Sequence, residues 1–267
     1  MKNIINSLNI DNETWQKALS SKKRIERVRA DTGEVYWLKK STPARGMFRY
    51  HALNLFSKLF RAPLLKAVPQ KGEQTALDLE AERITSLKKR GILVPELMAK
   101  EPGWILLKDL GVSIIDDFKQ NRHDMPRIRK LFADCLDGIK QLHKQDQYMS
   151  QGFVRNMLKI KEDPAQIGFI DFEDDPLTVM NLAQAQARDL ILFINSTARF
   201  FIKDSKFFQQ QIHKFIDGHN PEVIVNIFKT NNSLLWLTKL PFKKSLGHDY
   251  QKLKIGIEAL KNINPKL

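Results

Sequence analysis

The sequence predicts an α+β protein of two lobes, in which a small antiparallel β-sheet lobe is followed by a mainly helical lobe. Short apolar or alternating runs bounded by turn residues, which are typical of strands, are concentrated in the first 107 residues. From residue 125 onward most apolar residues recur at helical spacing. Between the two regions, Lys108-Asp-Leu-Gly interrupts the pattern as a linker does. We therefore expect an N-lobe at residues 1–107 and a C-lobe at residues 108–267.

The N-lobe elements follow from turn and cap residues. Asp11 precedes a stretch suited to a short helix, because aspartate is a favoured N-cap. Alternating residues over 24–30 and an aromatic and aliphatic run over 35–39 flank Asp31-Thr-Gly-Glu, which predicts a β-hairpin. A helix is expected over 75–90, since apolar residues recur among charges and Gly91 follows its end. Two further strands are expected, at residues 92–97 and from Trp104 onward, joined by a Glu101-Pro-Gly turn.

A long basic stretch divides this lobe. No acidic residue occurs between Val35 and Gly72, and over residues 48–65 the apolar positions recur roughly at helical spacing with bases between them. A basic amphipathic helix of this kind, within an insertion at residues 43–67, suits an anionic membrane surface, a lipid-like substrate or a phosphate backbone. The alternative is a helix that covers the lobe and exposes its basic face to water.

The C-lobe is predicted from two strong helical patterns. Residues 125–143 carry an apolar stripe, with Asp124 as the N-cap and Pro126 in the first turn. Residues 183–201 form a second helix that carries Asp189, and residues 204–267 predict three or four more, one of them beginning at Asn220-Pro221. Cys135, the only cysteine, lies on the first apolar stripe and is expected in the core, so the chain has no intramolecular disulfide.

Composition limits the function classes. With 42% hydrophobic and 28% charged residues, no run of about 18 apolar residues and no secretory signal at the N-terminus, the expected location is cytoplasmic, with peripheral contact at the inner membrane. A net charge of +14 fits nucleic acid, an anionic membrane surface or a phosphorylated substrate. No RRM, KH or zinc signature accompanies the charge, so nucleic-acid binding is the weakest of these alternatives.

The stretch Ile167-Gly-Phe-Ile-Asp-Phe-Glu-Asp-Asp places an acidic cluster, led by Asp171, at the end of an apolar strand. Closely spaced carboxylates repel one another unless a cation neutralises them. Asn156 lies fifteen residues earlier, before a second short strand at residues 157–160. An amide oxygen and a carboxylate at adjacent strand ends predict a Mg²⁺ site. The alternative is an ordinary hairpin with a polar turn at residues 162–165.

The order of these parts resembles the protein-kinase-like superfamily over roughly residues 24–200. Within it, the chain is most similar to small atypical bacterial kinases near the lipopolysaccharide-core (Kdo and heptose) kinases. Phe169-Ile-Asp-Phe-Glu-Asp-Asp-Pro followed by Ala185-Gln-Ala-Arg-Asp also resembles bacterial proteins usually labelled serine/threonine protein kinases. The resemblance implies a two-lobed kinase-like fold with ATP and Mg²⁺ as cofactors.

The resemblance also implies a role for each matched position. Lys39 would bind the α- and β-phosphates and Glu80 would orient it, with Lys40 and Glu82 as the alternatives in register. Asn156 and Asp171 would hold Mg²⁺. Asp189 would accept hydrogen bonds from the backbone of the catalytic loop. The four residues that would line the adenine pocket are Leu106, Leu107, Lys108 and Asp109.

Two departures from the kinase pattern bear on activity. No glycine-rich loop precedes Lys39, since Gly33 is the only earlier glycine. The catalytic-loop aspartate, expected five residues before Asn156, is replaced by Gln151. Loss of a general base costs roughly 10²–10⁴ in rate, so slow transfer remains chemically feasible. Three residues are possible substitutes: Asp146, His143 and Asp174.

Two functional readings follow from these observations. The first is an ATP- and Mg²⁺-dependent phosphotransferase acting on a membrane-proximal sugar-lipid or protein hydroxyl. The second is a pseudokinase, a nucleotide-binding regulatory or scaffold module without transfer chemistry.

Overall fold

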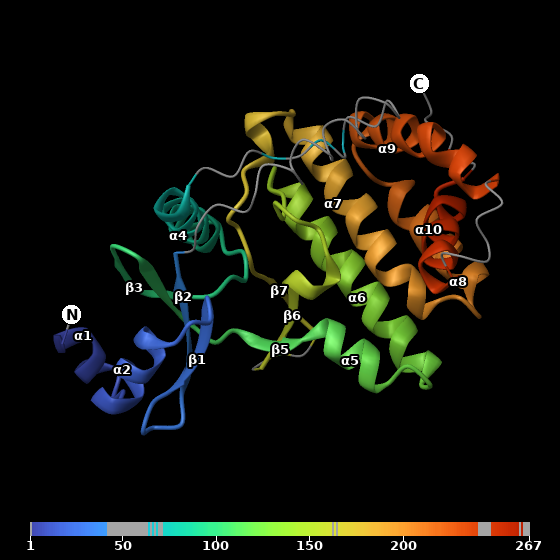
Figure 1. Cartoon of the computed structure of the whole chain (residues 1–267). Helices are drawn as coiled ribbons and strands as arrows, with labels where there is room; N and C mark the ends of the chain where they lie inside the picture. The colour runs from blue at the N-terminus through green and yellow to red at the C-terminus, as the bar shows by residue number, and fades with distance from the viewer. Residues whose placement is uncertain are drawn as a thin grey trace.

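The computed structural model describes residues 2–41, 64, 66, 68, 72–161, 163, 165–239, 247–261 and 263. Figure 1 shows a sheet-containing lobe at the N-terminal end and a larger helical lobe, with α4 and β5 near the junction. The basic helix expected at residues 48–65 lies almost entirely outside the described residues, as does the insertion at 43–67. No helix in the described part of the chain is both long and apolar enough to cross a bilayer.

The N-lobe is built on a four-stranded antiparallel sheet with the order β1-β2-β4-β3. Its elements are α1 (Lys2–Ser7), α2 (Asn12–Ser20), β1 (Ile25–Arg29), β2 (Val35–Lys40), α4 (Glu73–Lys89), β3 (Leu97–Glu101) and β4 (Trp104–Lys108). The expected hairpin is confirmed as β1 and β2, with Gly33 at φ +87° in the turn. Asp11 caps α2 as expected, because its carboxylate accepts the Thr14 N–H over 2.9 Å.

Both faces of this sheet are buried, as the run Trp-Ile-Leu-Leu of β4 requires. Trp104 and Leu106 pack into a small core with α1 and α2 on one face. Ile105 and Leu107 face the opposite side and join the main core with α4. The sheet therefore lies between two helical layers, and a residue on β2 or β4 reaches one layer or the other according to its parity.

The strand expected from Ile92 was wrong in its position, because β3 begins only at Leu97. Pro95 lacks a backbone N–H and cannot donate to a sheet ladder. The carbonyl of Leu93 instead accepts the Phe169 N–H over 2.9 Å. This segment thus connects the N-lobe to the second sheet.

The C-lobe contains a three-stranded antiparallel sheet, β5-β6-β7, covered by helices. Its elements are β5 (Gly111–Ser113), α5 (Ile114–Gln120), α6 (Met125–Lys144), η2 (Val154–Asn156), β6 (Met157–Ile160), β7 (Ile167–Phe169), η3 (Pro176–Thr178), α7 (Leu182–Thr197), η4 (Ala198–Phe200), α8 (Ser205–Ile216), α9 (Pro221–Leu234), η5 (Leu235–Lys239) and α10 (Gly247–Ala259). The predicted helix at 125–143 is confirmed as α6, and Asp124 caps it through the Arg127 N–H. Cys135 is buried in the core, as expected.

One continuous core joins the lobes. It runs from Leu87 on α4 and Ile105 on β4 to Phe132 on α6 and Phe193 on α7, all fully buried. The chain passes between the lobes at Asp109 and Leu110, between the end of β4 and the start of β5. The expected fold class is confirmed: α+β, two-lobed, with a small antiparallel sheet and a mainly helical second lobe.

Candidate active site

A buried ion pair between two elements of the N-lobe, β2 and α4, forms the centre of the site. The Lys39 Nζ on β2 lies 2.7 Å from Glu80 Oε2 on α4, and the two residues are only 6% and 1% exposed. Burial by itself lowers the pKa of Lys39, but the charges of Glu80, Asp171 and Glu173 outweigh it and raise that pKa above its usual value. Burial raises the pKa of Glu80, and the Lys39 ammonium opposes that shift. The cation is therefore fixed in its charged form.

The parity of β2 decides which lysine takes this place. Lys39 pairs in register with Ile105 and shares its face, toward α4. Lys40 points to the other face, where its Nζ donates to the carbonyl oxygens of Ala18 at 2.9 Å and Leu19 at 3.2 Å. Lys40 thus caps the end of α2. On α4, Glu82 is exposed, because two residues turn a helix by about 200° from Glu80.

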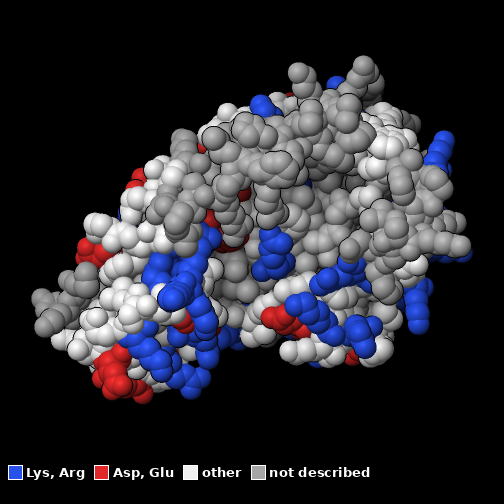
Figure 2. Space-filling model, viewed as in Figure 1, with Lys and Arg blue, Asp and Glu red and all other residues white. Residues whose placement is uncertain are grey.

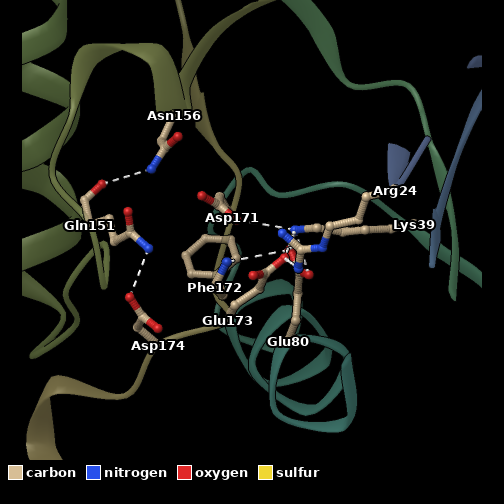
Figure 3. A network of polar contacts seen from close by, with 9 residues as sticks. All are labelled: Arg24, Lys39, Glu80, Gln151, Asn156, Asp171, Phe172, Glu173 and Asp174. Carbon is tan, nitrogen blue, oxygen red and sulfur yellow. Dashed lines mark hydrogen bonds and ion pairs between the residues drawn. The ribbon is translucent and has the colours of Figure 1, made fainter. Parts of the chain in front are cut away.

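The acidic segment after β7 turns sharply at Asp171. This residue has φ +72°, a left-handed conformation that aspartate adopts more readily than most side chains. The turn buries Phe172 completely and directs its N–H to Glu80 Oε1 at 3.4 Å. It also brings two carboxylates to Lys39, which lies 3.1 Å from Asp171 Oδ1 and 2.6 Å from Glu173 Oε1. Lys39 therefore contacts three carboxylates (Figure 3).

Asn156 lies at the same end of the second sheet as Asp171. It precedes β6, Asp171 follows β7, and Met157 pairs with Phe169 in the antiparallel ladder. Its carbonyl accepts the Ile170 N–H over 3.0 Å, and its Nδ2 donates to the Gln151 carbonyl over 3.0 Å. Figure 3 shows the Asn156 and Asp171 side chains on neighbouring segments.

The Asn156 and Asp171 oxygens fit the chemistry of Mg²⁺. This ion keeps several waters and binds one or two carboxylates together with substrate phosphates, rather than an all-protein cage. In the part of the chain that the structure describes, no group of three or more His, Cys, Asp and Glu side chains forms such a cage. The Asp171 side chain remains 29% exposed, which leaves it accessible to an ion and its waters.

Gln151, the residue that the sequence resemblance aligns with the catalytic aspartate of kinases, contacts a carboxylate. Its Nε2 donates to Asp174 Oδ2 over 2.7 Å. Burial, and then the charge of Asp171, raises the pKa of Asp174. Its other oxygen, Oδ1, is buried and has no hydrogen-bond partner among the described residues. A carboxylate is therefore held beside the glutamine (Figure 3).

The two other residues considered as substitutes lie elsewhere. Asp146 is exposed just beyond the end of α6. His143 is buried, with Nε2 at 3.4 Å from Asp189 Oδ2 and Nδ1 at 3.0 Å from His219 Nε2. Of the three candidates, only Asp174 contacts Gln151.

Asp189 holds the loop that carries Gln151. It is buried on α7, and its Oδ2 accepts the Met149 N–H over 2.6 Å. Gly152 lies against the same residue so closely that an added Cβ would be 2.2 Å from the Asp189 carbonyl oxygen. The carboxylate and the glycine together fix the backbone on both sides of Gln151.

The four residues expected to line an adenine pocket do not share one environment in the structure. Leu107 shares the face of Lys39, whereas the Leu106 side chain is buried on the opposite face with α1 and α2. The Leu106 side chain therefore does not line the site, because successive side chains of a strand point to opposite faces, as they do for Lys39 and Lys40. Lys108 pairs with Glu34 at 2.6 Å, and Asp109 accepts the Trp37 Nε1–H over 2.7 Å.

Sequence reasoning did not assign two residues of the site. Glu173 was noted only as part of the acidic cluster, and Arg24 only as the start of a hairpin. In the structure the Arg24 guanidinium pairs with the same Glu173 oxygen that contacts Lys39. No local signal links Arg24 to Glu173, because 149 residues separate them.

Comparisons with known proteins give matches only among solved structures, at low identity. No protein-family model and no curated protein matches the chain. Among solved structures, the chain is similar to the Rio2 kinase–ADP/Mg²⁺–phosphoaspartate complex from Chaetomium thermophilum, with 20% identity, a TM-score of 0.39, and coverage of 88% of this chain and 66% of that one. A second structure of Rio2 kinase from the same organism has 19% identity and a TM-score of 0.35, with coverage of 88% and 68%. The chain thus spans about two thirds of their length.

Proposed function

We propose that this protein is an ATP- and Mg²⁺-dependent phosphotransferase of the protein-kinase-like type that transfers a phosphoryl group to an alcohol. The observation that supports this most strongly is the buried Lys39–Glu80 pair, 2.7 Å apart, next to Asp171. A buried ion pair is expensive to maintain for stability alone. A cation held in a fixed position beside an acidic, accessible strand end suits the binding of a metal-bound polyphosphate.

The residues divide the work of phosphoryl transfer as follows. Lys39 would bind phosphate oxygens, and Glu80 keeps its ammonium in position. Asn156 and Asp171 would hold Mg²⁺, which neutralises charge on the phosphates when it is bound. Asp189 would keep the acceptor loop rigid through the Met149 N–H. Positioning and electrostatics of this kind account for most of the catalysis of phosphoryl transfer.

Gln151 and Asp174 would orient the acceptor hydroxyl. A glutamine cannot accept a proton, but the transition state is loose and positioning outweighs deprotonation. Asp174 is the carboxylate that contacts Gln151, with its Oδ2 2.7 Å from Gln151 Nε2. The raised pKa of Asp174, caused first by burial, makes it a better base than an exposed aspartate.

The acceptor we propose is a sugar-lipid or protein hydroxyl at the inner face of the membrane, in the cytoplasm. This part of the proposal rests on the resemblance to lipopolysaccharide-core kinases, the net charge of +14 and the basic residues of the 43–67 segment. The same charge would also favour association with anionic lipid or with a phosphorylated acceptor.

Nucleotide binding and transfer are tested separately. We expect ATP with Mg²⁺ to stabilise the parent by about 2.7 kcal/mol at a concentration 100-fold above the dissociation constant, and the protein to release ADP slowly. Asp171→Asn should lose most of the Mg²⁺-dependent part of the stabilisation, and Lys39→Met should abolish ADP release. Lys130→Met is the matched control, because the Lys130 side chain is 70% exposed on α6. An Asp171→Asn variant with the full Mg²⁺-dependent shift would place the metal elsewhere.

A nucleotide-binding module without transfer activity is the second candidate, and Gln151 is the residue that favours it. That reading predicts full stabilisation by ATP with no ADP release above the Lys39→Met background. Stabilisation with release above background supports the enzyme.

A further inference from the structure

Two cations converge on one carboxylate at the centre of the site. Arg24 precedes β1, and the first residue of that strand, Ile25, lies opposite Lys39 in the ladder. The Arg24 guanidinium and the Lys39 ammonium both contact Oε1 of Glu173 (Figure 3). The Arg24 Nε is also buried without a hydrogen-bond partner among the described residues. Arg24 therefore points into the site with a donor that no described protein group uses.

Glu173 is held by these two cations. Its side chain is 9% exposed, and its Oε1 contacts both the Lys39 ammonium and the Arg24 guanidinium. The other carboxylates at Lys39 have further roles. Glu80 also accepts the Phe172 N–H, and Asp171 is a proposed metal ligand. Glu173 is consequently the one of these three carboxylates whose only contacts among the described residues of the site are the two cations that a phosphate would also contact.

The backbone that carries Arg24 occupies the end of the sheet next to Lys39. Lys40 anchors this segment, because its side chain caps Ala18, Leu19 and Ser21 while its N–H donates to the Arg24 carbonyl over 2.8 Å. Lys22 and Lys23 are exposed on the same segment. Figure 2 shows Lys and Arg side chains gathered over this side of the N-lobe. An anchored basic segment thus lies beside Lys39 in a chain without a glycine-rich loop.

We propose that Arg24 and Lys39 together bind the terminal phosphates of the nucleotide, and that Glu173 occupies this phosphate position until the nucleotide displaces it. The proposal rests on the nucleotide site of the proposed function. A guanidinium binds phosphate oxygens through paired hydrogen bonds, and a phosphate carries more charge than the carboxylate it replaces. Once Glu173 is displaced, Arg24 and Lys39 both contact the phosphates. The two cations would then hold the phosphates in place of the glycine-rich backbone that covers them in kinases.

The two partners of one ion pair should then affect nucleotide binding with opposite sign. Calorimetric titration of the full chain with ATP plus Mg²⁺, with ATP alone and with adenosine measures the effect. We expect Arg24→Gln to weaken ATP binding about 10- to 100-fold, the range for a hydrogen bond to a charged group, and Glu173→Gln to tighten it severalfold. Neither should change adenosine binding, because adenosine carries no phosphate. Arg27→Gln, an exposed arginine on β1, is the matched control and should bind like the parent.

Several results would overturn the proposal. One is an Arg24→Gln affinity for ATP equal to that of Arg27→Gln. Another is weaker ATP binding by Glu173→Gln only when Mg²⁺ is present, which would make Glu173 a metal ligand. If Arg24→Gln does not fold, the ATP affinities of Arg24→Lys and Glu173→Gln test the proposal instead. Arg24→Lys keeps the charge but loses the paired hydrogen bonds, so it should bind ATP less tightly than the parent. A parent that binds neither ATP nor adenosine refutes the proposed function as well.

Discussion

Gln151 donates a hydrogen bond from Nε2 to Asp174 Oδ2 over 2.7 Å, although the two residues belong to different loops. The contact places a half-buried carboxylate with a raised pKa beside the glutamine that the sequence resemblance aligns with the catalytic aspartate of kinases. In the proposed phosphotransferase, Asp174, which lies in the loop after β7, would act on the acceptor side of the reaction. A hydrogen bond to the backbone holds each loop. The Gln151 carbonyl accepts from Asn156 Nδ2, and the Phe172 N–H donates to Glu80 Oε1.

Replacement of Asp174 tests this role. Asp174→Asn keeps the size of the side chain and removes the basic oxygen. We expect kcat for ADP release to fall about 10²- to 10⁴-fold, the usual cost of a lost general base, with the dissociation constant for ATP and Mg²⁺ unchanged. Asp146→Asn is the control, because Asp146 is exposed and was an equal candidate in the sequence. Equal rates in the two variants would remove Asp174 from the mechanism.

The three carboxylates around Lys39 predict that Lys39→Met and Glu80→Gln lower the free energy of unfolding by different amounts. Lys39→Met leaves Glu80, Asp171 and Glu173 facing one another without the ammonium, whereas Glu80→Gln leaves Lys39 two other partners. We expect urea unfolding to show a loss of about 3–5 kcal/mol for Lys39→Met, as for other broken buried pairs, and a smaller loss for Glu80→Gln.

The double variant distinguishes stability from function. Lys39→Met combined with Glu80→Gln should cost less than the sum of the single changes, because the two side chains are in contact. ADP release should remain at background, since the cation is absent. Strictly additive losses would indicate that the pair contributes no coupling energy.

The His143–His219 contact predicts a dependence of stability on pH. The Nδ1 of His219 accepts the Asn220 N–H over 2.9 Å, so the Nε2 of His219 carries the proton that it donates to His143 Nδ1. Burial, and then His143, lowers the pKa of His219 from 6.5 to about 4. In the unfolded chain this imidazole takes up a proton at its ordinary pKa, whereas in the folded chain it stays neutral.

The direction of this pH dependence follows from the lowered pKa of His219. The contribution of His219 to stability is fully present above about pH 6.5, where both states are neutral, and it is lost as the pH falls toward about 4. We expect a loss on the order of 1–3 kcal/mol, less than full conversion of the shift because the imidazole is only partly buried. In urea titrations between pH 4 and 7, His219→Gln should have a flatter profile than the parent and than the exposed control His123→Gln. Parallel profiles for all three proteins would contradict this assignment.

Local chemistry in the sequence determined the elements of this protein. Asp11 and Asp124 predicted two helix starts, Asp31-Thr-Gly-Glu predicted the β1–β2 turn, and the apolar run before Asp171 predicted β7. These features depend on neighbours within a few residues, so the sequence alone is sufficient to find them. The strand expected from Ile92 failed because Pro95 cannot donate to a sheet ladder and the Leu93 carbonyl accepts the N–H of Phe169 on β7, which is distant in the sequence.

Only the tertiary structure decided which residues meet. Lys39 and Lys40 are equivalent in sequence, but they lie on opposite faces of β2, and the packing of α4 on one face and α2 on the other makes one a site residue and the other a helix cap. Arg24 and Glu173, like Gln151 and Asp174, are brought together by the closure of the two sheets and their loops around one core. The physical reason is that a local pattern specifies the direction of a side chain only relative to its own strand or helix, while its partner is set by how those elements pack.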